Sequence, residues 1–173
     1  MDTRQLTKIA LCVALCCVAA YISFPLPFTP AYVSALTLAL SLTAFVLPPR
    51  ETFFVVLTYV LIGAVGMPVF AGQQGLAKLL GPSGGFYFAW LIAFPLLSLL
   101  KGAAPNFKRY TIADVLIAVP ITYVGGLLSM MIVSEISLSQ AFVAAVLPFI
   151  PGDVMKACAA AWLGVKLNRA LPK

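Results

Sequence analysis

Long uncharged stretches alternate with short charged segments along this chain. The uncharged stretches cover residues 9–49, 52–77, 79–100, 115–134 and 136–152, and an apolar run at 157–165 continues the last of them. A helix that crosses the roughly 30 Å hydrocarbon core of a bilayer needs about 20 mostly apolar residues. Most of these stretches therefore predict one membrane-crossing helix each, and the 41 residues of 9–49 have room for two.

Proline divides the first stretch. The sequence Phe-Pro-Leu-Pro-Phe-Thr-Pro at 24–30 cannot continue a helix, because proline lacks the backbone N–H that a helix uses, and it predicts a turn between two helices. The pattern as a whole predicts an all-α membrane protein, a single integral membrane domain of residues 1–173 with six transmembrane helices. Their approximate ranges are 6–23, 31–48, 52–70, 84–101, 111–133 and 139–168.

The basic residues fall mainly on one side of this six-helix arrangement. One side receives nine of the eleven Lys and Arg residues, the other receives only Lys78 in the 71–83 loop, and Lys156 lies inside the sixth helix. The nine are Arg4, Lys8, Arg50, Lys101, Lys108, Arg109, Lys166, Arg169 and Lys173. Short cytoplasmic loops of membrane proteins collect Lys and Arg. We therefore expect a multi-pass protein of the plasma membrane with both termini in the cytoplasm.

Composition excludes several classes of protein. Only 9% of residues are charged and 62% are hydrophobic, whereas a soluble domain carries roughly 25% charged residues. The absence of histidine removes the usual general base and the commonest metal ligand. Cys12, Cys16, Cys17 and Cys158 lack paired metal-ligand spacing and are interpreted as packing residues. With no nucleotide motif and no basic cluster interleaved with aromatics, we expect no cofactor, no metal and no nucleic-acid partner.

Two ionisable residues lie deep in the sixth predicted helix. Pro148 and Pro151 interrupt this helix, which must restart near 151 with Pro151 in its first turn. Counted back from Lys166 at the cytoplasmic interface at 1.5 Å per residue, Asp153 lies roughly 20 Å and Lys156 roughly 15 Å into the membrane. Charged groups at such depth face a protein interior or a water-filled cavity. They form either a self-neutralising ion pair or a ligand site, and the extra polar groups of a restarted helix favour the ligand site.

A second candidate region is the glycine-rich outer segment 66–86. Gln73 and Gln74 carry amides that both donate and accept hydrogen bonds, and aromatic side chains gather near the same membrane surface. The aromatic residues are Phe70, Phe86, Tyr87 and Trp90. Turn glycines beside an interfacial aromatic belt would explain the same pattern. Gly72, Gly75 and Gly81 also predict that the 71–83 loop closes over a bound ligand as a lid.

Small residues mark one face of the first predicted helix. Ala10 and Ala14 lie one turn apart, which lets another helix approach closely. The partner helix belongs either to this chain or to another protein, and alanine is too common in membrane helices for the pattern alone to decide.

Three ordered motifs give the sequence its resemblance to a known family. They are Gly-Met-Pro-Val-Phe-Ala at 66–71, Leu-Leu-Gly-Pro-Ser-Gly-Gly-Phe at 79–86 and Pro-Phe-Ile-Pro-Gly-Asp-Val-Met-Lys at 148–156. The chain resembles, over essentially its whole length, the BioY family of biotin-specific substrate-binding (S) components of energy-coupling factor (ECF) transporters. The resemblance implies a prokaryotic six-helix protein that binds biotin from outside and works with a membrane T component and two cytoplasmic ATPase subunits, which handle ATP.

The resemblance also implies roles for particular residues. Asp153 and Lys156 match motif positions linked with ligand binding, and Ala10 and Ala14 match a face that docks on the T component. The candidate substrate-binding residues are Asp153, Lys156, Gln73, Gln74, Phe70, Phe86, Tyr87 and Phe149. Where the family leads us to expect an asparagine-like contact, this chain has a Gly-Gln-Gln sequence, so the polar contact from the 71–83 loop stays open.

Biotin's parts have candidate partners in this set. Asp153 is expected to accept from the ureido N–H groups and Lys156 to donate to the ureido carbonyl or to the carboxylate, with aromatic side chains around the sulfur ring. The alternatives are an S component for another vitamin, a stand-alone biotin permease in which Asp153 couples to protons, and a membrane-embedded enzyme. We expect no enzymatic activity, because Asp153 is the only inward acid and the neighbouring amine would hold it ionised.

Overall fold

A computed structural model describes residues 2–25, 32–71 and 73–170 of the chain, and within these it is almost entirely helical. The helices are α1 (Thr3–Tyr21), α2 (Leu36–Val46), α3 (Pro49–Ala64), α4 (Leu76–Leu79), α5 (Gly84–Leu100), α6 (Phe107–Ala113), the π-helical turn η1 (Asp114–Ala118), α7 (Val119–Ser134), α8 (Leu138–Ala145) and α9 (Ile150–Ala170). The strands β1 (Ser23–Pro25) and β2 (Tyr32–Ser34) pair antiparallel, with Ser23 opposite Ser34.

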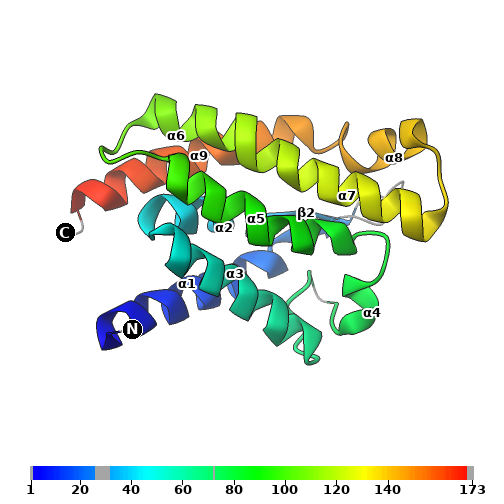
Figure 1. Ribbon diagram of the computed structural model, residues 1–173, viewed down its shortest axis with the longest axis horizontal. Helices are drawn as coiled ribbons and strands as arrows, with labels where there is room; N and C mark the ends of the chain where they lie inside the picture. The colour runs from blue at the N-terminus through cyan, green and yellow to red at the C-terminus, as the bar shows by residue number, and fades with distance from the viewer. Residues whose placement is uncertain (1, 26–31, 72, 171–173) are drawn as a thin grey trace.

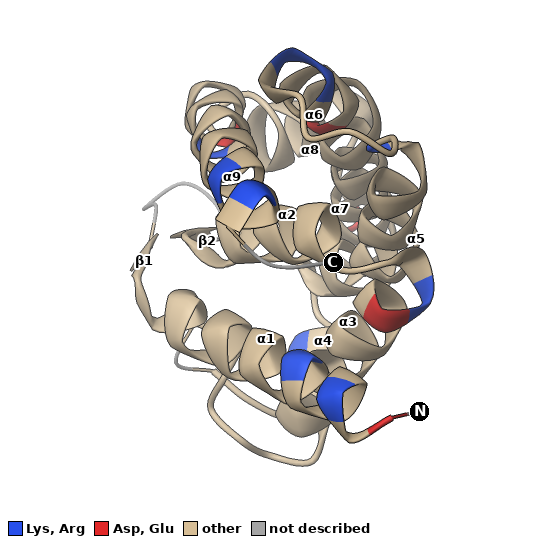
Figure 2. Ribbon diagram, turned by 90° about the vertical axis from the view of Figure 1, so that its left-hand side faces the viewer, with Lys and Arg blue, Asp and Glu red and all other residues tan. Residues whose placement is uncertain are grey.

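The long helices run between two ends of the molecule. The first and last described helices have their terminal ends at the same end of the molecule, and α4 and α8 lie at the opposite end (Figure 1). Seen from the end with the termini, Lys and Arg residues are visible on α1, α6 and α9 (Figure 2). Helix α5 packs against both α3 and α7, and α2 packs against α9. This arrangement places α2, α5, α7 and α9 around one interior region.

Two of the predicted helices have different first or last residues in the structure. The helix expected at 31–48 begins at Leu36, since Tyr32–Ser34 forms a strand. The turn predicted at 24–30 falls largely on residues 26–31, which lie outside the described part of the chain. The helix expected at 52–70 begins earlier, with Pro49 in its first turn, and ends at Ala64.

The helix predicted at 111–133 is longer and contains a π-helical turn. Residues Phe107–Ser134 form one continuous helix, and the Val119 N–H bonds to the carbonyl of Asp114, five residues back. Pro120 explains this turn, because its ring has no N–H to donate and clashes with the carbonyl four residues earlier. The extra residue in the turn changes the direction of the side chains before it relative to those after it, and Asp114 is the first residue of the turn.

Proline also breaks the last predicted helix. The range 139–168 is divided into α8 and α9, which lie at 46° to each other, and α9 begins at Ile150 with Pro151 in its first turn, as the sequence predicts. By length and composition, two helices of the described chain are able to cross a membrane, Thr3–Tyr21 and Phe107–Ser134, and the bent pair α8 and α9 adds a third. Helices α2 and α5 are apolar but shorter. The count of six spans stays a prediction.

Helices α5 and α7 approach each other at two glycines. A Cβ atom added to Gly85 would lie 1.9 Å from the carbonyl oxygen of Gly125, and one added to Gly125 would lie 2.4 Å from the carbonyl oxygen of Gly85. Real Cβ atoms do not come this close to backbone, so only glycine allows this packing. The contact fixes the distance between the two helices that carry Tyr87 and Tyr123, both of which line the interior cavity.

Candidate functional site

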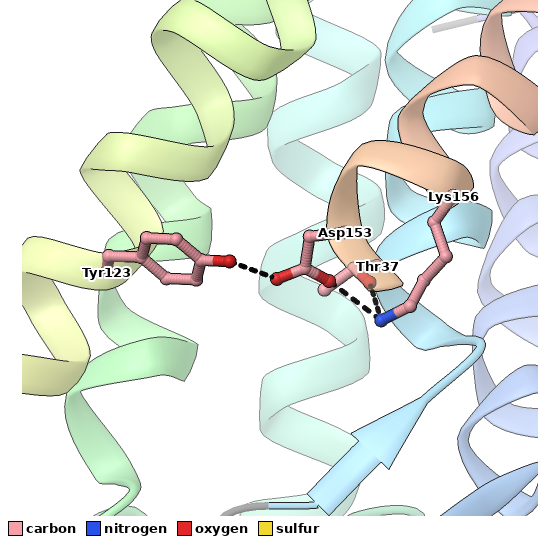
Figure 3. A network of polar contacts seen from close by, with 4 residues as sticks. All are labelled: Thr37, Tyr123, Asp153 and Lys156. Atoms are coloured by element: carbon pink, nitrogen blue, oxygen red, sulfur yellow. Dashed lines mark hydrogen bonds and ion pairs between the residues drawn. The ribbon is translucent and has the colours of Figure 1, made fainter. Parts of the chain in front are cut away.

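Asp153 lies at the centre of a polar cluster built from three helices. Its Oδ1 is 2.7 Å from the Lys156 Nζ, and its Oδ2 accepts a 2.8 Å hydrogen bond from the hydroxyl of Tyr123. The Lys156 Nζ also donates to the hydroxyl of Thr37 at 3.2 Å. Figure 3 shows Asp153 between Tyr123 of α7 and Lys156, with Thr37 of α2 beside the ammonium group. The side chains of Lys156 and Asp153 are only 17% and 12% exposed.

The local sequence explains why this cluster forms at the start of α9. Asp153 lies in the first turn of α9, where the positive end of the helix dipole favours a carboxylate. The Asp153 N–H bonds to the carbonyl of Phe149 at 2.8 Å, so the turn is closed around the restart. Lys156 follows three residues later on the same helix face and can reach the same carboxylate.

The cluster forms part of the wall of a cavity that is partly open to solvent. Helices α2, α5, α7 and α9 and the 71–83 loop supply most of the wall, and α1, β2 and the segment before α9 supply one residue each. The lining residues are Ala20, Ser34, Leu36, Thr37, Ala71, Lys78, Ser83, Phe86, Tyr87, Trp90, Thr122, Tyr123, Phe149, Asp153 and Lys156.

Five of the eight candidate substrate-binding residues lie in this wall, namely Asp153, Lys156, Phe86, Tyr87 and Phe149. The aromatic residues form its apolar side, where the Tyr87 and Trp90 rings meet edge to face with centroids 4.8 Å apart.

The other three candidates, Phe70, Gln73 and Gln74, lie outside the wall. The Phe70 ring is completely buried behind the cavity and packs on Tyr87 with ring centroids 4.5 Å apart. Gln73 and Gln74 are exposed, and the backbones of Phe70 and Gln73 exchange two hydrogen bonds of 3.0 Å. Phe70 thus supports an aromatic residue of the wall, and Lys78 and Ser83 are the polar residues that segment 73–83 contributes to it.

Several cavity residues are absent from the candidate set. Thr37 and Tyr123 contact Asp153 and Lys156, but they are 119 and 30 residues away from their partners in the sequence, and no motif links them. Trp90 was recognisable as an aromatic residue near the surface, but not by its indole N–H, which is buried and has no hydrogen-bond partner among the described residues.

Lys78 is the basic residue that the loop brings to the cavity. It lies on the short helix α4 and lines the wall, and burial lowers the pKa of its ammonium group. The loop before α4 has a constrained backbone, since Ala71 has φ of 52° and Gly75 has φ of 83°. Gly72, one of the proposed hinge residues, lies outside the described residues. The Gly75 N–H donates to the Gly63 carbonyl at 2.8 Å, which attaches the loop to the end of α3.

Ala10 and Ala14 lie on the outer surface of α1. Both are exposed, whereas Ile9, Val13 and Cys16 of the same helix are buried against the rest of the chain. The small-residue face is therefore not used for packing within the described molecule.

Comparison with known proteins bears on the meaning of this cavity. The BioY family model matches residues 1–173. Biotin transporter BioY2 of Lactococcus lactis subsp. cremoris is 36% identical over 171 residues, which cover 96% of this chain and 91% of the relative. A probable biotin transporter BioY of Pyrococcus horikoshii is 33% identical, with 97% of this chain and 98% of the relative covered.

A solved structure has the same fold. The S-component for biotin from an ECF-type ABC transporter superposes with a TM-score of 0.89 at 26% identity, with 98% of this chain and 95% of that chain covered. The resemblance inferred from the three motifs is thereby confirmed, and the chain is a component of a membrane transport system and not an enzyme. This chain belongs to the BioY family.

Proposed function

We propose that this chain takes up biotin as the S component of an ECF-type ABC transporter and binds it in the cavity between α2, α5, α7 and α9. The observation that carries the proposal is the division of the cavity wall. The polar cluster around Asp153 forms one part of the wall, and aromatic rings form another. Lys78 of the 71–83 loop adds a basic group. Biotin has a matching division into a ureido ring, an apolar sulfur ring and a carboxylate at the end of its chain.

The ureido ring is assigned to the Asp153 cluster. A carboxylate accepts several hydrogen bonds, so Asp153 keeps acceptor capacity for ureido N–H groups while it accepts from Tyr123 and Lys156. The Lys156 ammonium has three N–H bonds, of which Asp153 and Thr37 take two. The third is available to the ureido carbonyl.

The sulfur ring is assigned to the aromatic wall of Phe86, Tyr87, Trp90 and Phe149. These side chains offer apolar surface to the ring. The carboxylate is assigned to Lys78, since a charge-assisted hydrogen bond is among the stronger polar contacts available to a ligand.

We further propose the assembly in which this binding leads to uptake. The chain spans a prokaryotic plasma membrane six times with both termini in the cytoplasm, and the exposed Ala10 and Ala14 face of α1 docks on the T component, which works with two ATPase subunits. Supporting this arrangement are the position of α1 and α9, whose terminal ends lie together, and the exposure of both alanines.

Binding of labelled biotin to the purified chain tests the site, and uptake by cells tests the assembly. Biotin should bind with high affinity, other vitamins should fail to compete, and uptake should require the T component and the ATPase subunits. Preferential binding of another vitamin would favour the alternative S component. Full uptake without the partner subunits would favour a stand-alone permease.

A further inference from the structure

A second, smaller cavity adjoins the proposed biotin site. It is partly open. Its polar lining consists of Thr37, Ser41, Asp114, Thr122, Asp153 and Lys156. Thr37, Thr122, Asp153 and Lys156 also line the larger cavity, so the two spaces share one polar wall. A change of charge in one space therefore acts on the other through these side chains.

Asp114 lines the smaller cavity and has no role in the proposed binding of biotin. It is 2% exposed, and its Oδ2 has no hydrogen-bond partner among the residues that the structure describes. Ser41 hydrogen-bonds the Asp114 carboxyl group. Asp114 opens the π-helical turn η1, and π-helical turns occur frequently at functional sites. A buried carboxylate with an unused oxygen needs a partner from outside the protein.

The charges around Asp114 indicate what kind of partner fits. Asp153 and Lys156 of α9 lie 2.7 Å apart and neutralise each other, which leaves the charge of Asp114 uncompensated. Among the described lining residues, α2 contributes the hydroxyls of Thr37 and Ser41 and α5 contributes Phe94, so neither adds a charge. One positive charge would neutralise the Asp114 carboxylate. The hydroxyl oxygens of Thr37 and Ser41 would provide further ligands for a small cation.

We propose that Asp114 binds one monovalent cation, Na⁺ or a proton, and that this cation is linked to biotin binding in the adjoining cavity. The inference rests on the proposed biotin site. Biotin brings a carboxylate into the connected space, and Coulomb attraction in a low-dielectric interior makes the cation and the biotin anion strengthen each other. Linkage is reciprocal, so biotin must tighten cation binding by the same factor.

The test measures the biotin dissociation constant of the purified full chain between pH 6 and 8, first in choline chloride and then with Na⁺ replacing choline at constant ionic strength. Affinity is expected to improve by roughly tenfold, a typical allosteric coupling, toward low pH if the cation is a proton or with Na⁺ if it is sodium. Asp114→Asn, which is neutral and of the same shape, should bind biotin without either dependence. Glu135→Gln, an exposed acid removed as a matched control, should keep the dependence of the wild type.

Each failure has a distinct meaning. Wild-type affinity that is flat in both pH and Na⁺ would overturn the cation site, and so would an Asp114→Asn protein that keeps the dependence. Loss of biotin binding by the wild type would instead refute the biotin site itself. If Asp114→Asn does not fold, Ser41→Ala replaces it, because removing the hydroxyl that contacts Asp114 must shift the midpoint of the dependence. An unchanged midpoint would place the cation elsewhere.

Discussion

At the residue scale, one carboxylate holds the candidate site together. Asp153 accepts hydrogen bonds from Tyr123 and Lys156, so it connects α7 to α9, and Lys156 extends the network to Thr37 of α2. Removing either charged partner strands the other in a mostly buried position. Breaking a buried pair in this way costs on the order of 3–5 kcal/mol.

We therefore predict that Asp153→Asn and Lys156→Ala each weaken biotin binding by more than about 100-fold while the protein still inserts into the membrane. Lys166→Ala serves as the matched control, since Lys166 lies on the same helix, is exposed and contacts the Trp162 ring. Equilibrium binding of labelled biotin to the purified variants is the measurement. Wild-type affinity in both variants would reject the assignment of this site.

Lys78 allows the position of the biotin carboxylate to be tested separately. Lys78→Gln is expected to weaken biotin binding by about 10- to 100-fold, because a hydrogen bond to a charged group contributes about 1.5–3 kcal/mol. The same substitution should leave the binding of biotin amide, which has no carboxylate, almost unchanged. Competition assays with the two ligands on both proteins give the comparison. An equal loss for both ligands would mean that Lys78 only maintains the shape of the loop.

At the element scale, proline decides most of the departures from regular helices, and the sequence reveals only some of them. The start of α9 near Pro151 is predictable, because Pro148 interrupts the preceding helix and proline is favoured in a first turn, where Pro151 lies. Pro120 is different, since an interior proline can kink a helix, end it or produce a π-helical turn. The neighbouring helices select among these outcomes, so the direction of Asp114 could not be read from the sequence.

The 71–83 loop is the element for which we predict a change on ligand binding. It contributes Ala71, Lys78 and Ser83 to the cavity wall, so a bound ligand should hold it in place. Protection from hydrogen exchange or protease should increase in this loop when biotin is added. The connection at 101–106, which contributes no residue to the cavity wall, provides the internal reference. Equal protection of the loop with and without biotin would contradict its role as a lid.

At the scale of the whole molecule, the proposed biotin site and the proposed docking face lie on separate surfaces. Ala10 and Ala14 face outward on α1, whereas α1 contributes only Ala20 to the cavity. Bulk at position 14 should therefore prevent the approach of a partner helix without reaching the ligand.

We predict that Ala14→Trp still binds labelled biotin, while its co-purification with the T component and ATP-dependent uptake are lost together. Ala14→Ser, which keeps a small side chain, should behave as the wild type in all three assays. Intact co-purification of the tryptophan variant would show that this face of α1 is not the docking surface. Loss of biotin binding would show that it supports the fold.

The helical segments could be predicted from the sequence better than the side-chain contacts that form the cavity. Apolar length and proline placed the helical segments, and depth in the membrane singled out Asp153 and Lys156. The contacts that complete the cavity come from distant parts of the chain, as with Lys156 and Thr37, and nothing local to either residue indicates them. Gln73 and Gln74 were predicted to bind the substrate because their amides donate and accept hydrogen bonds. In the structure the backbones of Phe70 and Gln73 pair, and both glutamine residues are exposed.

The contact between Gly85 and Gly125 has a consequence for how ligand preference can change. These residues bring the two backbones of α5 and α7 into contact, next to the helix positions that supply Phe86 and Tyr123 to the cavity wall. A methyl group at either glycine would force the helices apart and widen the binding space without altering any side chain that meets the ligand. We therefore predict that Gly85→Ala or Gly125→Ala changes the width of the ligand that the proposed site accepts, although neither residue lines the cavity.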